Sequence, residues 1–175
     1  MERIGLPDVF AVSPTVEEEI DPDARPGELV AFWSLQKAKS VAVSFADDIV
    51  IAADTIVWHD GKVIGKPRDE SGAAVTLRHL SGDRHEVYTG LTVIKGDTVV
   101  TETEMSAVYM RAMSEDEIAA YIKTGEPMDK AGAYGIQERG ALLCERVDGD
   151  FYNVMGLPVY RLGKILSSLG VNLFS

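Results

Sequence analysis

Residues 48–65, DIVIAADTIVWHDGKVIG, decide the fold of this chain. Segment 48–58 is almost continuous in β-branched and small apolar residues, which is typical of a strand covered on both faces. Asp60 and Gly61 then form the residue pair that tight hairpin turns prefer, and a return strand is expected over 62–65. The segment therefore predicts a buried strand that turns back on itself within a sheet.

Helices and further strands are expected on both sides of this hairpin. Pro26 favours the start of a helix over 27–45, in which Trp33, Lys37 and Val41 recur at four-residue spacing. This spacing places Lys37 on the buried side of the helix. The other expected elements are a short strand over 9–13, a helix over 70–80, paired strands over 85–95 and 98–110, a helix after Ser114 and a helix from Pro158.

The order of these elements predicts a single α/β domain over residues 1–175. Helices interspersed with hairpins and a buried strand indicate a mixed β-sheet flanked by helices. At 175 residues and 46% hydrophobic, the chain is long enough for one core but short for two comfortable domains.

Composition argues against several classes of protein. The net charge of −11 disfavours nucleic-acid binding, because that function needs a basic face to neutralise phosphates. The sequence has no run of about 18 apolar residues and no secretory signal pattern, so we expect no membrane partner. Cys144 is the single cysteine, which fits a reducing compartment and predicts a cytoplasmic protein.

Asp54 is the residue most indicative of chemistry. A carboxylate inside a buried strand costs several kcal/mol unless it is hydrogen-bonded, ion-paired or bound to a metal. The residue pattern leaves open whether Asp54 has a structural role, such as a hydrogen bond to Thr55, or a functional one. Lys66 follows the hairpin in a GKP segment, where the chain can return it to the side of Asp54.

Two further groups of polar residues have open interpretations. Glu17 begins a run of three acids, which is most often a solvated loop, but one of them can join Asp54 in holding a hard divalent cation. The histidines at positions 59, 79 and 85 show no metal-ligand spacing, and we expect structural roles for them.

Four long segments resemble the Maf family of nucleoside triphosphate pyrophosphatases. They are AADTIVWHDGKVIGKP at 52–67, LRHLSGDRHEVYTGL at 77–91, GEPMDKAGAYGIQERG at 125–140 and DGDFYNVMGLP at 148–158. The resemblance implies a fold related to inosine triphosphate pyrophosphatases, with a cleft between two lobes, usually a homodimer. It implies hydrolysis of a nucleoside triphosphate to the monophosphate and pyrophosphate with Mg²⁺, Mn²⁺ or Co²⁺. The AYGIQ segment is similar to the branch that acts on dTTP and UTP.

The resemblance also implies roles for particular residues. Asp54 matches the family's catalytic base, Glu17 and Lys37 match further active-site residues, and Lys66 matches the lysine of the GKP block. Glu17 and Asp54 would hold the metal ion. Thr55 and Gln137 fall on positions associated with base selection, and the amide of Gln137 can both donate to O4 and accept from N3 of uracil or thymine.

The start of the sequence departs from the family pattern. The family opens with a strand and a Ser-x-Ser-x-Arg-Arg segment that grips phosphate, whereas this sequence begins MERIGLP. We expect a chain that is truncated at its N-terminus and impaired in catalysis. The alternative function is a catalytically impaired Maf-like protein that acts through a partner in septum formation and cell-division control.

Overall fold

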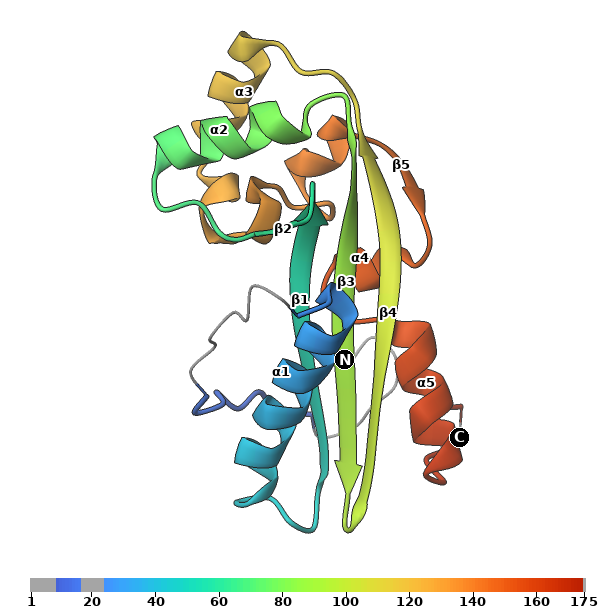
Figure 1. Ribbon diagram of the computed structural model, residues 1–175. Helices are drawn as coiled ribbons and strands as arrows, with labels where there is room; N and C mark the ends of the chain where they lie inside the picture. Colours follow the sequence, from blue (N-terminus) through green and yellow to red (C-terminus); the bar gives the residue numbers. More distant parts are fainter. Residues whose placement is uncertain (1–8, 17–23, 175) are drawn as a thin grey trace.

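The computed structural model describes residues 9–16 and 24–174, in which five strands form one sheet in the order β2-β1-β3-β4-β5. Figure 1 shows the sheet with helices at both of its ends. The elements in chain order are α1 (Pro26–Ala42), β1 (Ile49–His59), β2 (Lys62–Ile64), α2 (Glu70–Leu80), β3 (Arg84–Lys95), β4 (Thr98–Met110), α3 (Glu115–Ile122), the 3₁₀ turns η2 (Glu126–Asp129), η3 (Ala131–Ala133) and η4 (Arg139–Leu143), β5 (Cys144–Asp148), α4 (Phe151–Val154) and α5 (Val159–Ser168).

The α/β class is confirmed, but all four strand pairings among the described residues are antiparallel, so the prediction of a mixed sheet is wrong. The apolar run of β1 reflects burial by helices and loops on both faces, which an antiparallel strand can also have. Two hairpins join β1 to β2 and β3 to β4, and α2 returns the chain so that β3 runs opposite to β1. The strand expected over 9–13 is also absent, and this exposed segment has no regular structure.

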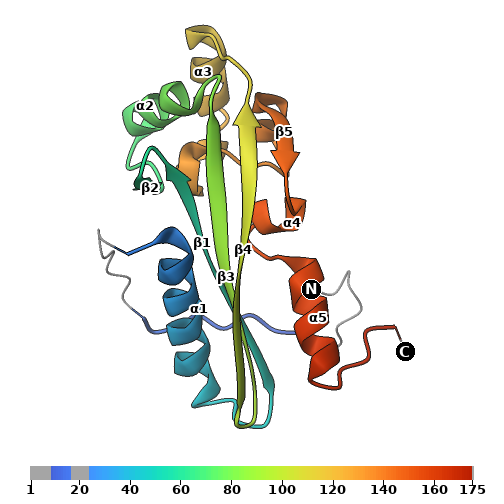
Figure 2. The ribbon, with the colours of Figure 1, turned by 45° about the vertical axis from the view of Figure 1, so that its right-hand side comes forward.

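The hydrophobic core is divided between the two ends of the sheet. One cluster lies under α2 and α3, where Val57, Leu77 and Val87 are almost fully buried. At the other end α1 covers one face and α5 the other, each over its own apolar cluster (Figure 2). The protein therefore has two lobes that share the long strands: the upper lobe carries α2 and α3, and the lower lobe carries α1 and α5 (Figure 1). No helix in the described ranges is both long and apolar enough to cross a membrane.

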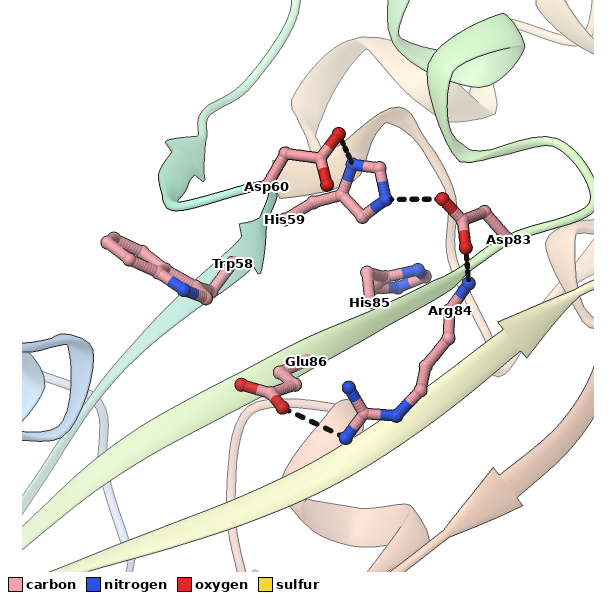
Figure 3. A pocket seen from close by; sticks show the side chains of 7 residues that line it. All are labelled: Trp58, His59, Asp60, Asp83, Arg84, His85 and Glu86. Atoms are coloured by element: carbon pink, nitrogen blue, oxygen red, sulfur yellow. Dashed lines mark hydrogen bonds and ion pairs between the residues drawn. The ribbon is translucent and has the colours of Figure 1, made fainter.

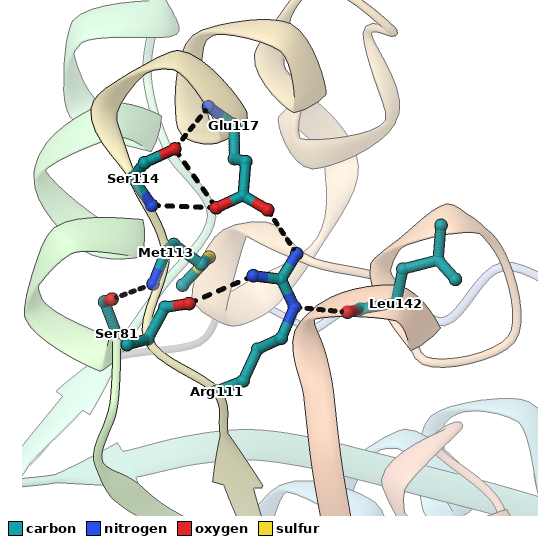
Figure 4. Close-up of polar contacts among 7 residues, drawn as sticks. Ser81, Arg111, Met113, Ser114, Glu117 and Leu142 are labelled. Atoms are coloured by element: carbon teal, nitrogen blue, oxygen red, sulfur yellow. Dashed lines mark hydrogen bonds and ion pairs between the residues drawn. The ribbon is translucent and has the colours of Figure 1, made fainter.

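Polar contacts at the N-terminal end of α3 connect it to neighbouring segments of the upper lobe. Ser114 and Glu117 form a capping box, and the guanidinium of Arg111 donates to Glu117 and to the carbonyl oxygen of Leu142 (Figure 4). The hydrogen bonds from Arg111 and from Ser114 lower the pKa of Glu117 to about 2. Arg111 thus ties the end of β4 to α3 and η4.

His85 connects β3 to the segment that follows η3. Its ring nitrogen Nε2 lies 2.8 Å from the hydroxyl of Tyr134, and both side chains are buried. Burial is the main cause that lowers the pKa of His85 to about 4, and the nearby His59 lowers it further. His85 is therefore neutral in the folded protein at pH 6, whereas an unfolded histidine is largely protonated there.

We expect acid to destabilise the protein through His85. The pKa of His85 is lower in the folded chain than in the unfolded chain, so the neutral ring contributes its full stabilisation above pH 6.5. The free energy of unfolding then decreases by about 3 kcal/mol as the pH falls to 4. Urea unfolding between pH 7 and 4 measures the slope, with His85→Gln as the comparison. Equal slopes for the native chain and the variant would show that His85 is not the cause.

Candidate active site

Asp54 lies at the centre of β1, between the two parts of the core. Val50 on one side belongs to the lower cluster and Val57 on the other side to the upper cluster. Asp54 is only 7% exposed, and it pairs across the sheet with Gly90 of β3. A buried carboxylate thus occupies the point where the two lobes meet.

The backbone of α1 is in direct contact with the sheet at Gly90. A Cβ atom at this position would overlap the carbonyl group of Val30, so only glycine permits the contact. Two hydroxyl contacts hold the helix in this place: Ser34 with Thr92 at 3.0 Å, and Thr103 with the carbonyl oxygen of Gly27 at 3.3 Å. The position of α1 is therefore fixed beside Asp54 by its packing on β3 and β4.

Lys37 uses this position to reach Asp54. Its Nζ atom donates to Oδ1 of Asp54 at 2.5 Å, and the lysine side chain is 19% exposed. Helical side chains tilt towards the N-terminus of their helix, which directs Lys37 along α1 towards the centre of the sheet. A charge-assisted hydrogen bond at the edge of the core holds both groups in one geometry.

Thr55 lies on the opposite face of β1 from Asp54, because successive side chains of a strand alternate. Its hydroxyl lies 2.9 Å from that of Thr89, which in turn donates to the carbonyl oxygen of Asn153. The fully buried Asn153 donates to the carbonyl oxygen of Val87 and to Ser106. Thr55 is thus part of a polar network that anchors α4 to the sheet.

β2 covers only one end of the outer edge of β1. Within the described residues, β2 pairs with β1 only at Val57, Trp58 and His59. At Asp54 and Thr55 the strand has no β2 partner along its outer edge. A ligand that crosses this edge can contact groups from both faces.

Lys66 and Gln137 are both exposed and lie on segments of the upper lobe. The side chains of these two residues form no hydrogen bond or ion pair with any part of the chain that the structure describes. Gly132 donates to the carbonyl oxygen of Gly65, so the segment before Lys66 contacts the loop that carries Gln137. The charge of Lys66 makes a small contribution to lowering the pKa of Asp129, after the larger effect of Lys130.

Glu126 fixes the loop on both sides of Gln137. Its carboxylate accepts hydrogen bonds from the backbone of Arg139 and Gly140 and from the hydroxyl of Tyr121, which itself accepts from the backbone of Gly135. Burial raises the pKa of Glu126, but these hydrogen bonds outweigh it and lower the pKa overall. The backbone around Gln137 is therefore held by a single charged group.

The chain is similar to known proteins over almost its full length. A family model described as Maf-like protein matches residues 1–169. The chain belongs to the Maf family. Of the candidate residues in this Maf chain, Lys37 and Asp54 are in contact, and Thr55 lies on the opposite face of β1. Lys66 and Gln137 lie on the upper lobe. Glu17 lies outside the described residues.

Several Maf-family relatives match almost the full chain. A protein of Methanosarcina mazei is 47% identical over 95% of this chain and 86% of its own length. One of Dictyoglomus thermophilum is 48% identical over 99% and 91%, and one of Symbiobacterium thermophilum is 43% identical over 100% and 90%. Each of the three is named dTTP/UTP pyrophosphatase.

Two residues that shape the candidate site were not identified from the sequence. Gly90 and Asn153 both lie in segments that carried the resemblance, but neither residue type points to chemistry by itself. A glycine inside a strand is a signal of close backbone approach, and this signal was available at Gly90. The partners of Asn153 lie 47 and 66 residues away along the chain, so no local pattern indicates them.

We expect Gly90→Ala to separate α1 from the sheet. The added methyl group overlaps the backbone at Val30, which cannot move without shifting the helix, and overpacking of this kind costs about 1–3 kcal/mol or more. Gly65→Ala is the matched control, because nothing lies within 4 Å of a Cβ atom there. Thermal unfolding measures the effect. A Gly90→Ala protein as stable as the Gly65→Ala control would contradict the proposed contact.

Proposed function

We propose that this Maf-family protein hydrolyses dTTP and UTP to the nucleoside monophosphate and pyrophosphate. The observation that carries the proposal is the ion pair between Lys37 and the buried Asp54 at the centre of β1. The relatives named dTTP/UTP pyrophosphatase, at 43–48% identity over nearly the whole chain, support the same activity. This activity is favoured over a role only through a partner in division control, because the chain has a buried carboxylate paired with a lysine, an arrangement suited to catalysis.

Asp54 is the proposed general base. Attack of water on the α-phosphorus requires a group that accepts a proton from that water, and a carboxylate held beside an ammonium group is available as an acceptor. Lys37 orients the carboxylate through their hydrogen bond and places positive charge near the transferred group. Lys66, on the upper lobe, is proposed to stabilise charge on the pyrophosphate that leaves.

A divalent cation is part of this proposal. Asp54 offers a carboxylate oxygen, which is the ligand type that Mg²⁺ and Mn²⁺ prefer, and Glu17 is the second proposed ligand. When bound, Mg²⁺, Mn²⁺ or Co²⁺ would polarise the phosphoryl oxygens and neutralise part of the triphosphate charge.

Pyrimidine selection is assigned to Gln137 and Thr55. The amide of Gln137 is exposed on a loop that Glu126 holds in place, so it is available to a ligand without being free to move widely. Thr55 presents a hydroxyl from the other face of β1, close to the turn at Gly156. The proposal also includes a cytoplasmic location, supported by the single cysteine, and a homodimer, supported by the family resemblance.

We expect Asp54→Asn to lower the rate of pyrophosphate release from UTP by at least about 100-fold, because the amide cannot accept the proton. The variant keeps the shape of the side chain and should fold. Asp48→Asn, an exposed acid just before β1, is the matched control and should retain full activity. A folded Asp54→Asn enzyme with native turnover would exclude Asp54 as the base.

We expect Gln137→Ala to reduce the preference for UTP over ATP by about tenfold or more. A site that hydrogen-bonds its substrate discriminates through the groups that a wrong substrate leaves unsatisfied. The ratio of kcat/KM for the two nucleotides measures this, and Glu138→Ala, exposed on the same loop, is the control. Equal losses on UTP and ATP would assign Gln137 another role.

A further inference from the structure

A second group of chemically active side chains lies at the far end of β1. His59 ends this strand, Asp60 begins the turn into β2, and His79 lies in the last turn of α2. One ligand atom from each of the three residues lies within 4.8 Å of the other two. The cluster sits beside a cavity of about 250 Å³ that is lined in part by His59 and Asp60.

The ring of His59 is oriented by a carboxylate. Its Nε2 atom lies 3.0 Å from Oδ2 of Asp83, and the other oxygen of Asp83 accepts from the backbone N–H of Arg84 at 2.7 Å (Figure 3). A hydrogen bond from Nε2–H of His59 to this carboxylate fixes the tautomer that carries its proton on Nε2, so the lone pair of Nδ1 points the other way.

The Nδ1 atom of His59 is buried and has no hydrogen-bond partner within the described ranges. The side chain of His59 is only 3% exposed. Figure 3 shows Nδ1 directed towards the carboxylate of Asp60. A buried nitrogen without a hydrogen bond destabilises the folded chain, and a ligand bound at Nδ1 would remove this penalty.

The spacing of the three groups suits one metal ion. Oδ2 of Asp60 lies 3.8 Å from Nδ1 of His59 and 3.5 Å from Nε2 of His79, too long for good hydrogen bonds. Ligands bonded to a tetrahedral zinc ion at about 2.0–2.2 Å are separated from one another by roughly 3.4 Å. Only small side-chain shifts are needed to close on the ion.

We propose that His59, Asp60 and His79 bind one divalent transition-metal ion of the zinc class, with Asp83 as the positioning residue behind His59. Two imidazole nitrogens and one carboxylate oxygen match Zn²⁺, whereas Mg²⁺ and Ca²⁺ prefer oxygen ligands alone. A histidine ligand whose other nitrogen donates to a carboxylate is the usual arrangement around such ions. Asp60 and His79 are 68% and 49% exposed, which leaves room for water in the fourth position.

The bound ion would connect two elements of the upper lobe. It would join the β1–β2 turn to the end of α2, where the rings of His59 and His79 already meet edge to face at 4.5 Å. An ion that binds the folded chain and not the unfolded one stabilises the fold in proportion to its concentration. The site contains none of the residues proposed for catalysis, so it does not depend on the proposed function.

Calorimetric titration of the untagged, chelator-treated protein with ZnCl₂ tests the site. We expect one ion per chain and a rise in Tm with added zinc. His79→Gln and Asp60→Asn should each weaken binding by more than tenfold, and Asp83→Asn by roughly 10- to 100-fold. Asparagine tolerates the positive φ of 49° at position 60, so the turn should keep its shape.

Two controls separate this site from others. Asp97→Asn, in the turn between β3 and β4, makes the same chemical change in an exposed hairpin turn and should leave zinc binding unchanged. Asp54→Asn should also retain the ion, and Cu²⁺ bound in place of zinc should give an electron paramagnetic resonance spectrum with coupling to two nitrogens. No bound zinc, or binding that His79→Gln leaves intact, would overturn the proposal, as would an ion that Asp54→Asn removes.

Discussion

The contact between the backbone of α1 and Gly90 is the constraint on which the candidate site depends. Because Gly90 is paired with Asp54, the same close approach that seats the helix also brings it beside the carboxylate. Lys37 then needs only its own length to reach Oδ1. A side chain at position 90 would move the whole helix, and the ion pair would be lost with it. The backbone contact between α1 and β3 therefore determines where the two charged side chains of this site meet.

The alternation of side chains along β1 divides the candidate residues between two environments. Asp54 faces α1 and an ammonium group, whereas Thr55 faces the hydroxyl of Thr89, which donates to the backbone carbonyl oxygen of the buried Asn153. One environment suits proton transfer beside a phosphate, and the other suits neutral hydrogen bonding to a base. The limited pairing with β2 makes the outer edge of the strand the place where a single ligand can reach both. A longer β2 would close this edge with hydrogen bonds, whereas the short β2 leaves the edge at Asp54 and Thr55 unpaired with it.

The sequence predicted those features that depend on neighbouring residues. The bounds of α2 and β4 and the start of α3 after Ser114 all follow from local patterns and are confirmed. The inward position of Lys37 followed from helical spacing. Strand direction did not, because burial on both faces does not distinguish parallel from antiparallel neighbours. The cluster of His59 and His79 was missed for a related reason: the two histidines are twenty positions apart, and the hairpin turn and helix between them follow no metal-ligand spacing.

The two lobes share their longest strands, which restrains them from moving as independent rigid bodies. Apolar clusters stabilise both lobes, hydroxyl contacts add to the lower one, and charged groups such as Glu126 and Arg111 fasten the loops of the upper one. Yet β1 and β3 run through both, with Val50 and Val57 of one strand buried in opposite cores. Opening the lobes about a hinge would require bending two hydrogen-bonded strands at Asp54 and Gly90, where the helix backbone is already in contact. Adjustment to a ligand is therefore expected to come from the loops of the upper lobe, while the centre of β1 supplies the fixed point against which they close.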